Sequence, residues 1–210
     1  MNGLIKKDLL LLKYNYKVVL ILLAFYGFMA ISCDFDLTLL LPFTSVMIMI
    51  STFSYDSYNK WDVYSITLPK GRYNSVLAKY FTTLLIILVE SIIIFIMDIG
   101  IYYYRTKLIE FNIILSSLLG SIFACLLILS FMFPCIYKFG VEKARSGIFV
   151  IGFGIIIIGG LISKFVDIEI IIQILNGLNN YIFIVLIITM IIMVIISYFI
   201  SEHIFRNKEF

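Results

Sequence analysis

Few residues of this chain have the types and spacing that chemistry requires. The single histidine, His203, lies near the C-terminal end, and the three cysteines (Cys33, Cys125 and Cys135) have no CxxC spacing and no nearby histidine. These positions do not match the patterns of a zinc site, a disulfide framework or a nucleophile beside its base. The sequence therefore predicts no metal site and no catalytic site.

Glycine patterns that bind phosphate are also missing. The chain has no GxxxxGK[ST] loop, which is the usual device for holding the phosphates of ATP. The glycines of 152–160 (GFGIIIIGG) lie inside an apolar run without a preceding strand. Close helix packing is the simpler interpretation, and a flexible or broken helix is the alternative. We expect no cofactor in this chain.

Glu90 is the acidic residue in the most unusual position, near the middle of the apolar run 80–101. That run is long enough to span a bilayer, where a central carboxylate costs about 2.5–3.5 kcal/mol on insertion scales. Its side chain should therefore face other helices. The polar residues at a similar depth are Ser45, Ser121, Cys125 and Thr189. Glu90 is then either a structural, hydrogen-bonded carboxyl or a lining residue of a translocation path or subunit seam.

The longest polar interval between apolar runs is 54–80, and it holds the only tryptophan, Trp61. Asp56 and Lys60 have the i, i+4 spacing of a favourable ion pair. Pro69 should end the local helix, and Gly71 permits a reversal into the next one. The segment is therefore expected to form a short helix, a tight turn and the start of a span.

An aromatic stripe is predicted along that short helix, because Tyr55, Tyr58, Trp61 and Tyr64 are three residues apart. Part of the stripe can be an interfacial anchor. An anchor explains poorly why so long a segment is structured, so we favour a surface that contacts a soluble partner.

These residues must be positioned by membrane-spanning helices. The chain of 210 residues is 62% hydrophobic and 14% charged, whereas soluble domains average about 25% charged residues. We expect an all-α integral membrane protein with an N-terminal interfacial helix over 1–17 and six transmembrane helices. Residues 164–180 are expected to form a surface or re-entrant helix. The expected spans are about 18–32, 37–54, 80–101, 112–136, 147–163 and 181–201.

The distribution of lysine and arginine predicts the orientation. Thirteen of the 16 Lys and Arg residues fall in the N-terminal helix, the 55–79 segment, the 137–146 loop and the tail. The other three are Arg105, Lys107 and Lys164. By the positive-inside rule the first set is cytoplasmic, so both termini are expected in the cytoplasm.

Three segments carry a resemblance to a known family. The first is the pattern D-x4-W-x2-Y-x3-LP-x2-R-x3-V-x2-KY, formed by Asp56, Trp61, Tyr64, Leu68, Pro69, Arg72, Val76, Lys79 and Tyr80. The second is PCIYKFGVEKARS over 134–146, and the third is the opening LIKKDLLLLK. In this order they resemble type-two ABC transporter permeases, most closely the small branch that includes phenol-soluble modulin and antimicrobial-peptide exporters. Ser57 departs from the pattern, because the family often has an acidic residue there.

The resemblance implies a permease subunit in the bacterial cytoplasmic membrane that exports a membrane-active amphipathic peptide. Its implied partners are an ABC ATPase dimer, which would bind ATP and magnesium, a second permease subunit and the lipid bilayer, with no nucleic acid. Cytoplasmic coupling helices would contact the ATPase. The implied contact residues are Asp56, Trp61, Tyr64, Arg72, Glu142, Lys143 and Arg145.

Two other functions stay open. One is a non-transporting immunity or sensor protein that binds an ATPase, which the sequence does not separate from an exporter. The other is an intramembrane enzyme, which the lack of paired catalytic residues at one depth disfavours.

Overall fold

The computed structural model describes residues 2–33, 36–67, 71–107, 111–147 and 179–208, and these are helices and short connections without a strand. Residues 141–147 are also helical. The named elements are α1 (Asn2–Cys33), the 3-10 helix η1 (Leu37–Leu39), α2 (Leu40–Tyr58), α3 (Trp61–Ile66), α4 (Gly71–Thr106), α5 (Phe111–Phe139) and α8 (Asn179–Arg206). The predicted all-α fold class is confirmed for these residues.

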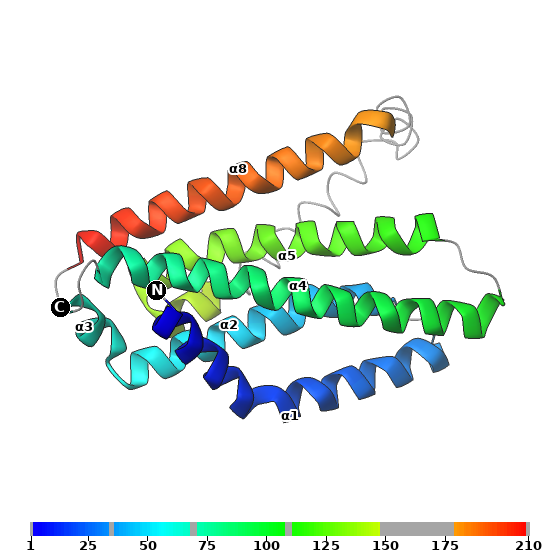
Figure 1. Cartoon of the computed structure of the whole chain (residues 1–210), viewed down its shortest axis with the longest axis horizontal. Helices are drawn as coiled ribbons and strands as arrows, with labels where there is room; N and C mark the ends of the chain where they lie inside the picture. The colour runs from blue at the N-terminus through cyan, green and yellow to red at the C-terminus, as the bar shows by residue number, and fades with distance from the viewer. Residues whose placement is uncertain (1, 34–35, 68–70, 108–110, 148–178, 209–210) are drawn as a thin grey trace.

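The long helices lie roughly side by side, and Figure 1 places the N-terminus, α3 and the C-terminus at the same end of the bundle. The last turn of α4 and the first turn of α5 lie at the opposite end. Lys60 and Arg206 are thus at one end and Lys107 is at the other, as the charge distribution predicts. That the first end is cytoplasmic remains a prediction.

Four of the described helices are long and apolar enough to cross a membrane: Leu37–Tyr58, Gly71–Tyr104, Phe111–Phe139 and Ile187–Arg206. Leu20–Ser32 in α1 is a shorter apolar stretch. The predicted fifth span, 147–163, and the predicted surface helix, 164–180, fall almost wholly outside the described residues. The chain is therefore an integral membrane protein by its helices, and the number of six spans stays a prediction.

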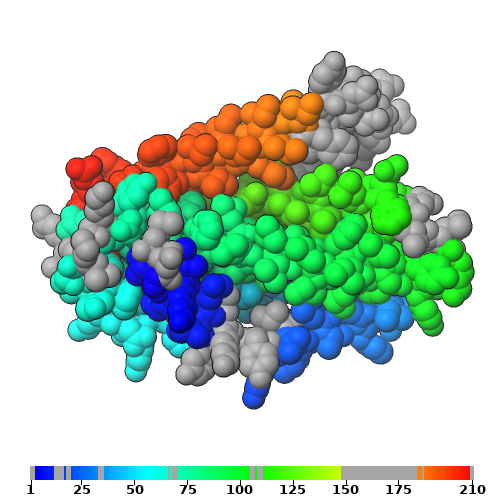
Figure 2. All heavy atoms as spheres, viewed as in Figure 1, coloured from blue at the N-terminus to red at the C-terminus, as the bar shows by residue number. Residues whose placement is uncertain are grey.

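The expected interfacial helix and first span form one continuous helix, α1. In Figure 1 the dark blue N-terminal part of α1 lies at an angle to the rest of the helix. Figure 2 shows this part against α4, which extends along much of the same face. The N-terminal part of α1 is thus packed on the bundle.

An aromatic cluster forms the core near the end that carries α3. The ring of Phe133 in α5 packs edge-to-face against Tyr80 of α4 at 4.7 Å and against Phe53 of α2 at 5.3 Å. Tyr137 lies 5.2 Å from Phe205, which is fully buried near the end of α8. Such pairs add about 0.5–1.5 kcal/mol beyond their buried area, so four helices are held together here.

Pro134 leaves a backbone acceptor in α5 that a neighbouring helix uses. Proline has no N–H, so the carbonyl of Ser130, four residues earlier, loses its helical donor. The hydroxyl of Ser197 in α8 donates to this carbonyl at 2.6 Å. The hydroxyl of Tyr80 in turn lies 2.6 Å from Ser197 and 2.9 Å from Ser201. A proline in a membrane helix thereby becomes a link between α4, α5 and α8.

We expect Ser197→Ala to destabilise the chain by about 1 kcal/mol, within the range of hydrogen bonds between membrane helices. In a Pro134→Ala background, the backbone N–H of residue 134 supplies the missing donor, so the same change should cost less. Thermal unfolding of the four variants in detergent measures the difference. Equal costs in both backgrounds would contradict the link between Pro134 and Ser197.

Candidate functional site

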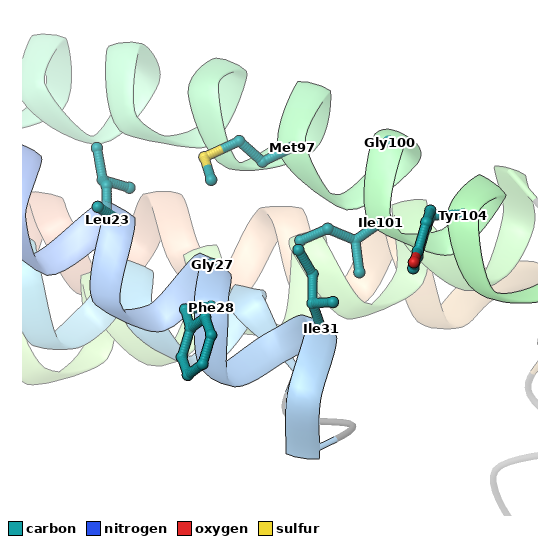
Figure 3. A pocket seen from close by; sticks show the side chains of 9 residues that line it. Leu23, Gly27, Phe28, Ile31, Met97, Gly100, Ile101 and Tyr104 are labelled. Atoms are coloured by element: carbon teal, nitrogen blue, oxygen red, sulfur yellow. The ribbon is translucent and has the colours of Figure 1, made fainter.

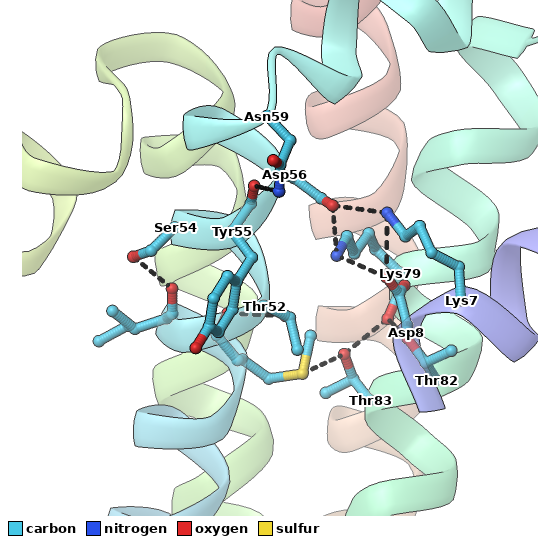
Figure 4. Close-up of polar contacts among 12 residues, drawn as sticks. Lys7, Asp8, Thr52, Ser54, Tyr55, Asp56, Asn59, Lys79, Thr82 and Thr83 are labelled. Atoms are coloured by element: carbon cyan, nitrogen blue, oxygen red, sulfur yellow. Dashed lines mark hydrogen bonds and ion pairs between the residues drawn. The ribbon is translucent and has the colours of Figure 1, made fainter. Parts of the chain in front are cut away.

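Four charged side chains meet where α1, α2 and α4 converge, and we call them the charged ring: Lys7, Asp8, Asp56 and Lys79. Lys7 Nζ lies 2.5 Å from Asp56 Oδ1 and 3.2 Å from Asp8 Oδ1. Lys79 Nζ lies 2.7 Å from Asp56 Oδ2 and 3.0 Å from Asp8 Oδ1. Figure 4 shows the four side chains pointing toward one another from the three helices.

Three members of the charged ring are buried, the side chain of Lys7 is 23% exposed, and the four charges balance. The side chains of Asp8 and Lys79 are only 4% and 5% exposed. A buried charge is costly unless it is paired and hydrogen-bonded, and here each positive group contacts two negative ones. The ring therefore holds the three helices in one register and tolerates poorly the loss of any member.

Aromatic rings lie over both lysines of the charged ring. Lys7 Nζ is 4.3 Å from the centre of the Trp61 ring, and Lys79 Nζ is 4.9 Å from that of Phe53. Both distances are within the range of cation–π attraction. Trp61 is the first residue of α3, so this contact joins α3 directly to the charged ring.

A left-handed residue separates α3 from α2. Lys60 has φ 50° and ψ 36°, a conformation that ends a helix and that most residues adopt at a cost. Tyr58 is therefore the last residue of α2 and Trp61 the first of α3. The predicted stripe on a single helix is wrong, because the chain turns between its second and third members. Trp61 and Tyr64 still pack together, with ring centres 5.1 Å apart.

The predicted pair of Asp56 with Lys60 is also replaced in the structure. Asp56 is 6% exposed and is held by Lys7 and Lys79, whereas Lys60 is exposed. The sequence predicts only an interfacial helix over 1–17 and gives Lys7 and Asp8 no partners. Their position in the ring depends on contacts between residues 49 and 71 positions apart, which spacing along one helix does not reveal.

The other predicted contact residues lie at the same end of the bundle. Tyr64 is 55% exposed, and Glu142, Lys143 and Arg145 are exposed on the helical residues 141–147. That short helix follows Gly140, whose φ of 85° favours glycine. Ala144 on it is buried in the core, so the charged residues around it are directed outward.

Arg72 has an internal role in the structure. Its guanidinium donates a hydrogen bond to the carbonyl of Arg206, the last residue of α8, at 2.5 Å. Carbonyls at helix ends lack partners within the helix, so Arg72 caps α8 from the first turn of α4. Nearby in α3, burial raises the pKa of Asp62, and Lys208 offsets this only in part. Lys208 thus lies close to α3.

Glu90 occupies the middle of α4 and is 9% exposed. Neither of its carboxyl oxygens has a hydrogen-bond partner among the described residues, although Thr44 and Ser45 of α2 are its neighbours. Both hydroxyls donate to α2 carbonyls, Thr44 to Leu40 and Ser45 to Leu41. Ser45 also lies 2.9 Å from Cys125 Sγ in α5. Glu90 therefore faces a polar seam between helices, as its sequence position predicts.

A comparison with protein-family models matches residues 3–206 to the family described as ABC-2 family transporter protein. The chain belongs to this family. The comparisons with curated proteins and with solved structures give no significant match. The match covers nearly the whole chain, so the charged ring, α3 and Glu90 are all parts of an ABC-2 membrane domain.

The family places the site residues in a transport protein. Among the described residues, no group of three or more His, Cys, Asp or Glu could hold a metal ion. The predicted roles of Trp61, Tyr64 and the 142–145 charges at an ATPase surface, and of Glu90 on a translocation path, remain predictions for this ABC-2 protein.

We expect Glu90→Leu to raise the thermal stability of this ABC-2 protein, because it removes a buried carboxyl without a partner, a state that costs about 1–3 kcal/mol. Glu90→Gln keeps the size and polarity of the side chain and serves as the matched control. Unfolding in detergent measures stability, and transport in vesicles measures function. Lower stability of the leucine variant would show that the carboxyl makes a stabilising contact.

Proposed function

We propose that this chain is the membrane permease subunit of an ABC exporter in the bacterial cytoplasmic membrane. A separate ATPase subunit would bind ATP and magnesium, and a second permease subunit would complete the transporter. The substrate we propose is a membrane-active amphipathic peptide. The substrate rests on the resemblance to small peptide-exporter permeases, and the transporter class rests on membership of the ABC-2 family.

The observation that best supports coupling to an ATPase is the position of α3. Tyr58, just before α3, is 87% exposed, and Val63 and Tyr64 are 52% and 55% exposed. Exposed large apolar and aromatic residues on a polar end of a protein are typical of an interaction site. Tyrosine and tryptophan are also enriched among the residues that dominate binding energy.

The charged ring connects α3 to the membrane helices through direct contacts. A partner that moves α3 would move Trp61, whose ring covers Lys7. Lys7 is bound to α2 through Asp56, and Lys79 binds the same carboxylate from α4. A rigid network of this kind transmits a displacement to several helices together. We therefore assign Asp56 and Arg72 to positioning, and Trp61 and Tyr64 to the contact with the ATPase.

The exposed charges Glu142, Lys143 and Arg145 would form the second part of the same contact. Charges at the rim of an interface contribute to partner choice and association rate more than to affinity. A rim role fits their exposure and the burial of Ala144 between them. Both termini would then lie on the ATPase side of the membrane.

The proposal is tested by co-expressing the chain with ABC ATPase subunits from the same organism. The two proteins should co-purify, and amphipathic peptides added to the reconstituted complex should stimulate ATP hydrolysis. Co-purification without stimulation or peptide export would favour the immunity or sensor function. Failure to bind any ABC ATPase of that organism would contradict the proposal.

A further inference from the structure

A groove of about 560 Å³ lies between α1 and α4, away from the charged ring. Figure 3 shows its lining from both helices. The lining residues are Leu23, Ala24, Gly27, Phe28 and Ile31 from α1, and Met97, Gly100, Ile101 and Tyr104 from α4. Its volume is in the range of ligand sites, which are about 300–1,000 Å³.

Two glycines shape this groove. A side chain at Gly27 would begin 3.2 Å from the terminal methyl of Met97, so the two helices approach closely there. At Gly100, by contrast, an added Cβ would meet no atom within 4 Å. The helices therefore touch at Gly27 and leave open space beside Gly100, toward the end of the bundle opposite α3.

The surroundings of the groove indicate what fills it. The α1 residues of the lining extend over about 12 Å of helix at 1.5 Å per residue, within the apolar stretch Leu20–Ser32. Phe28 is 68% exposed and Ile31 is 52% exposed, so the groove opens on a surface that the bilayer covers. An apolar chain of the bilayer is the occupant that this lining matches.

The side chain of Lys107 lies near one end of the groove. Tyr104 closes that end beyond Ile101 in Figure 3, and Lys107 Nζ is 5.7 Å from the centre of its ring. Lys107 is exposed at the end of α4. Lysine beside an aromatic residue at a membrane boundary attracts the phosphate of an anionic lipid.

We propose that the groove binds one acyl chain of an anionic phospholipid, with the lipid phosphate at Lys107. The tail occupies the space beside Gly100, and the headgroup contacts the ammonium group. The bound lipid fills the gap between α1 and α4. This site is separate from the proposed ATPase contact and does not depend on it.

The test uses the purified full-length chain, stripped of lipid in detergent and reloaded with phosphatidylglycerol or phosphatidylcholine. Native mass spectrometry counts the bound lipids. We expect the wild-type chain to prefer phosphatidylglycerol about fivefold, the effect of one basic residue near an anionic headgroup. Gly100→Leu should fill the groove and lose the bound lipid. Gly120→Leu is the matched control, because Gly120 on α5 also has open space around it and lies outside the groove.

Lys107→Gln should keep the lipid and lose the preference, and its exposed position makes a folding defect unexpected. Equal lipid binding by the Gly100→Leu and wild-type chains would overturn the proposal. An unchanged preference in Lys107→Gln would overturn it as well. If the wild-type chain is a dimer and Gly100→Leu is a monomer with unchanged lipid binding, the groove would instead be assigned to a second copy of the chain.

Discussion

Lys79→Met is expected to lower the free energy of unfolding by about 3–5 kcal/mol, which is the usual cost of removing one partner from a buried ion pair. Lys79 contacts both Asp8 and Asp56 from a side chain that is 5% exposed. Without it, Lys7 remains as the only cation in the ring beside two buried carboxylates. Methionine has a similar length, so the change removes the charge with little loss of volume.

A second substitution tests whether charge balance is the cause. Adding Asp56→Asn to Lys79→Met leaves Lys7 and Asp8 as a balanced pair, 3.2 Å apart. The double variant should therefore be more stable than Lys79→Met alone. Thermal unfolding in detergent measures both. A cost below about 0.5 kcal/mol for the single change, typical of surface sites, would contradict the burial and coupling of the ring.

Trp61→Ala is expected to weaken binding of the ATPase subunit about 30-fold, as truncation of a central interface anchor costs about 2 kcal/mol or more. The change removes the ring that covers Lys7 at 4.3 Å and packs against Tyr64 at 5.1 Å. Transport should fall in parallel, while insertion into the membrane stays normal. Co-purification of the ATPase and peptide export from cells measure the two effects.

Trp61→Phe is the matched variant, because phenylalanine keeps an aromatic face over Lys7 with less contact area. It should retain more ATPase than Trp61→Ala. Suppose that Trp61→Ala instead holds its ATPase at the wild-type ratio but loses stability in detergent. Trp61 would then be a membrane anchor, and coupling would rest on the 137–146 segment alone.

The helical membrane fold could be predicted from the sequence because apolar runs of spanning length are a strong local signal. The positions of the basic residues also predict which segments share one end of the bundle. Glu90 was predictable as a residue facing other helices, because the cost of exposing a carboxyl to lipid decides its direction. These inferences depend on the surroundings of one residue or one run.

The partners of Asp56 could not be predicted in the same way. The i, i+4 rule assigns it to Lys60, but the left-handed conformation of Lys60 ends the helix. Lys7 and Lys79 reach Asp56 from two other helices. Lys79 and Asp56 both belong to the pattern that resembles ABC permeases, so an ion pair between them could have been considered from the sequence. Asp8 offered one further signal, as an acidic residue on an otherwise basic and apolar segment.

The role of Pro134 shows the same limit. Pro134 lies near the end of the predicted span 112–136. Because proline has no N–H, the carbonyl of Ser130 is expected to lack its helical hydrogen-bond donor. Which helix supplies the donor depends on the packing of α8 against α5. Ser197 fills this role in the structure, and no spacing in the sequence connects two residues 67 positions apart.

The most direct test of ATPase docking at α3 compares two tyrosines of nearly equal exposure. Tyr64 in α3 is 55% exposed, and Tyr103 at the opposite end of the bundle is 54% exposed. The measurement is the dissociation constant of the ATPase subunit for the chain in lipid nanodiscs, with Tyr64→Ala or Tyr103→Ala. We predict that Tyr64→Ala weakens binding about tenfold, a loss of about 1.4 kcal/mol, and that Tyr103→Ala leaves it unchanged. Equal affinities of the two variants, or weaker binding only by Tyr103→Ala, would contradict docking at α3.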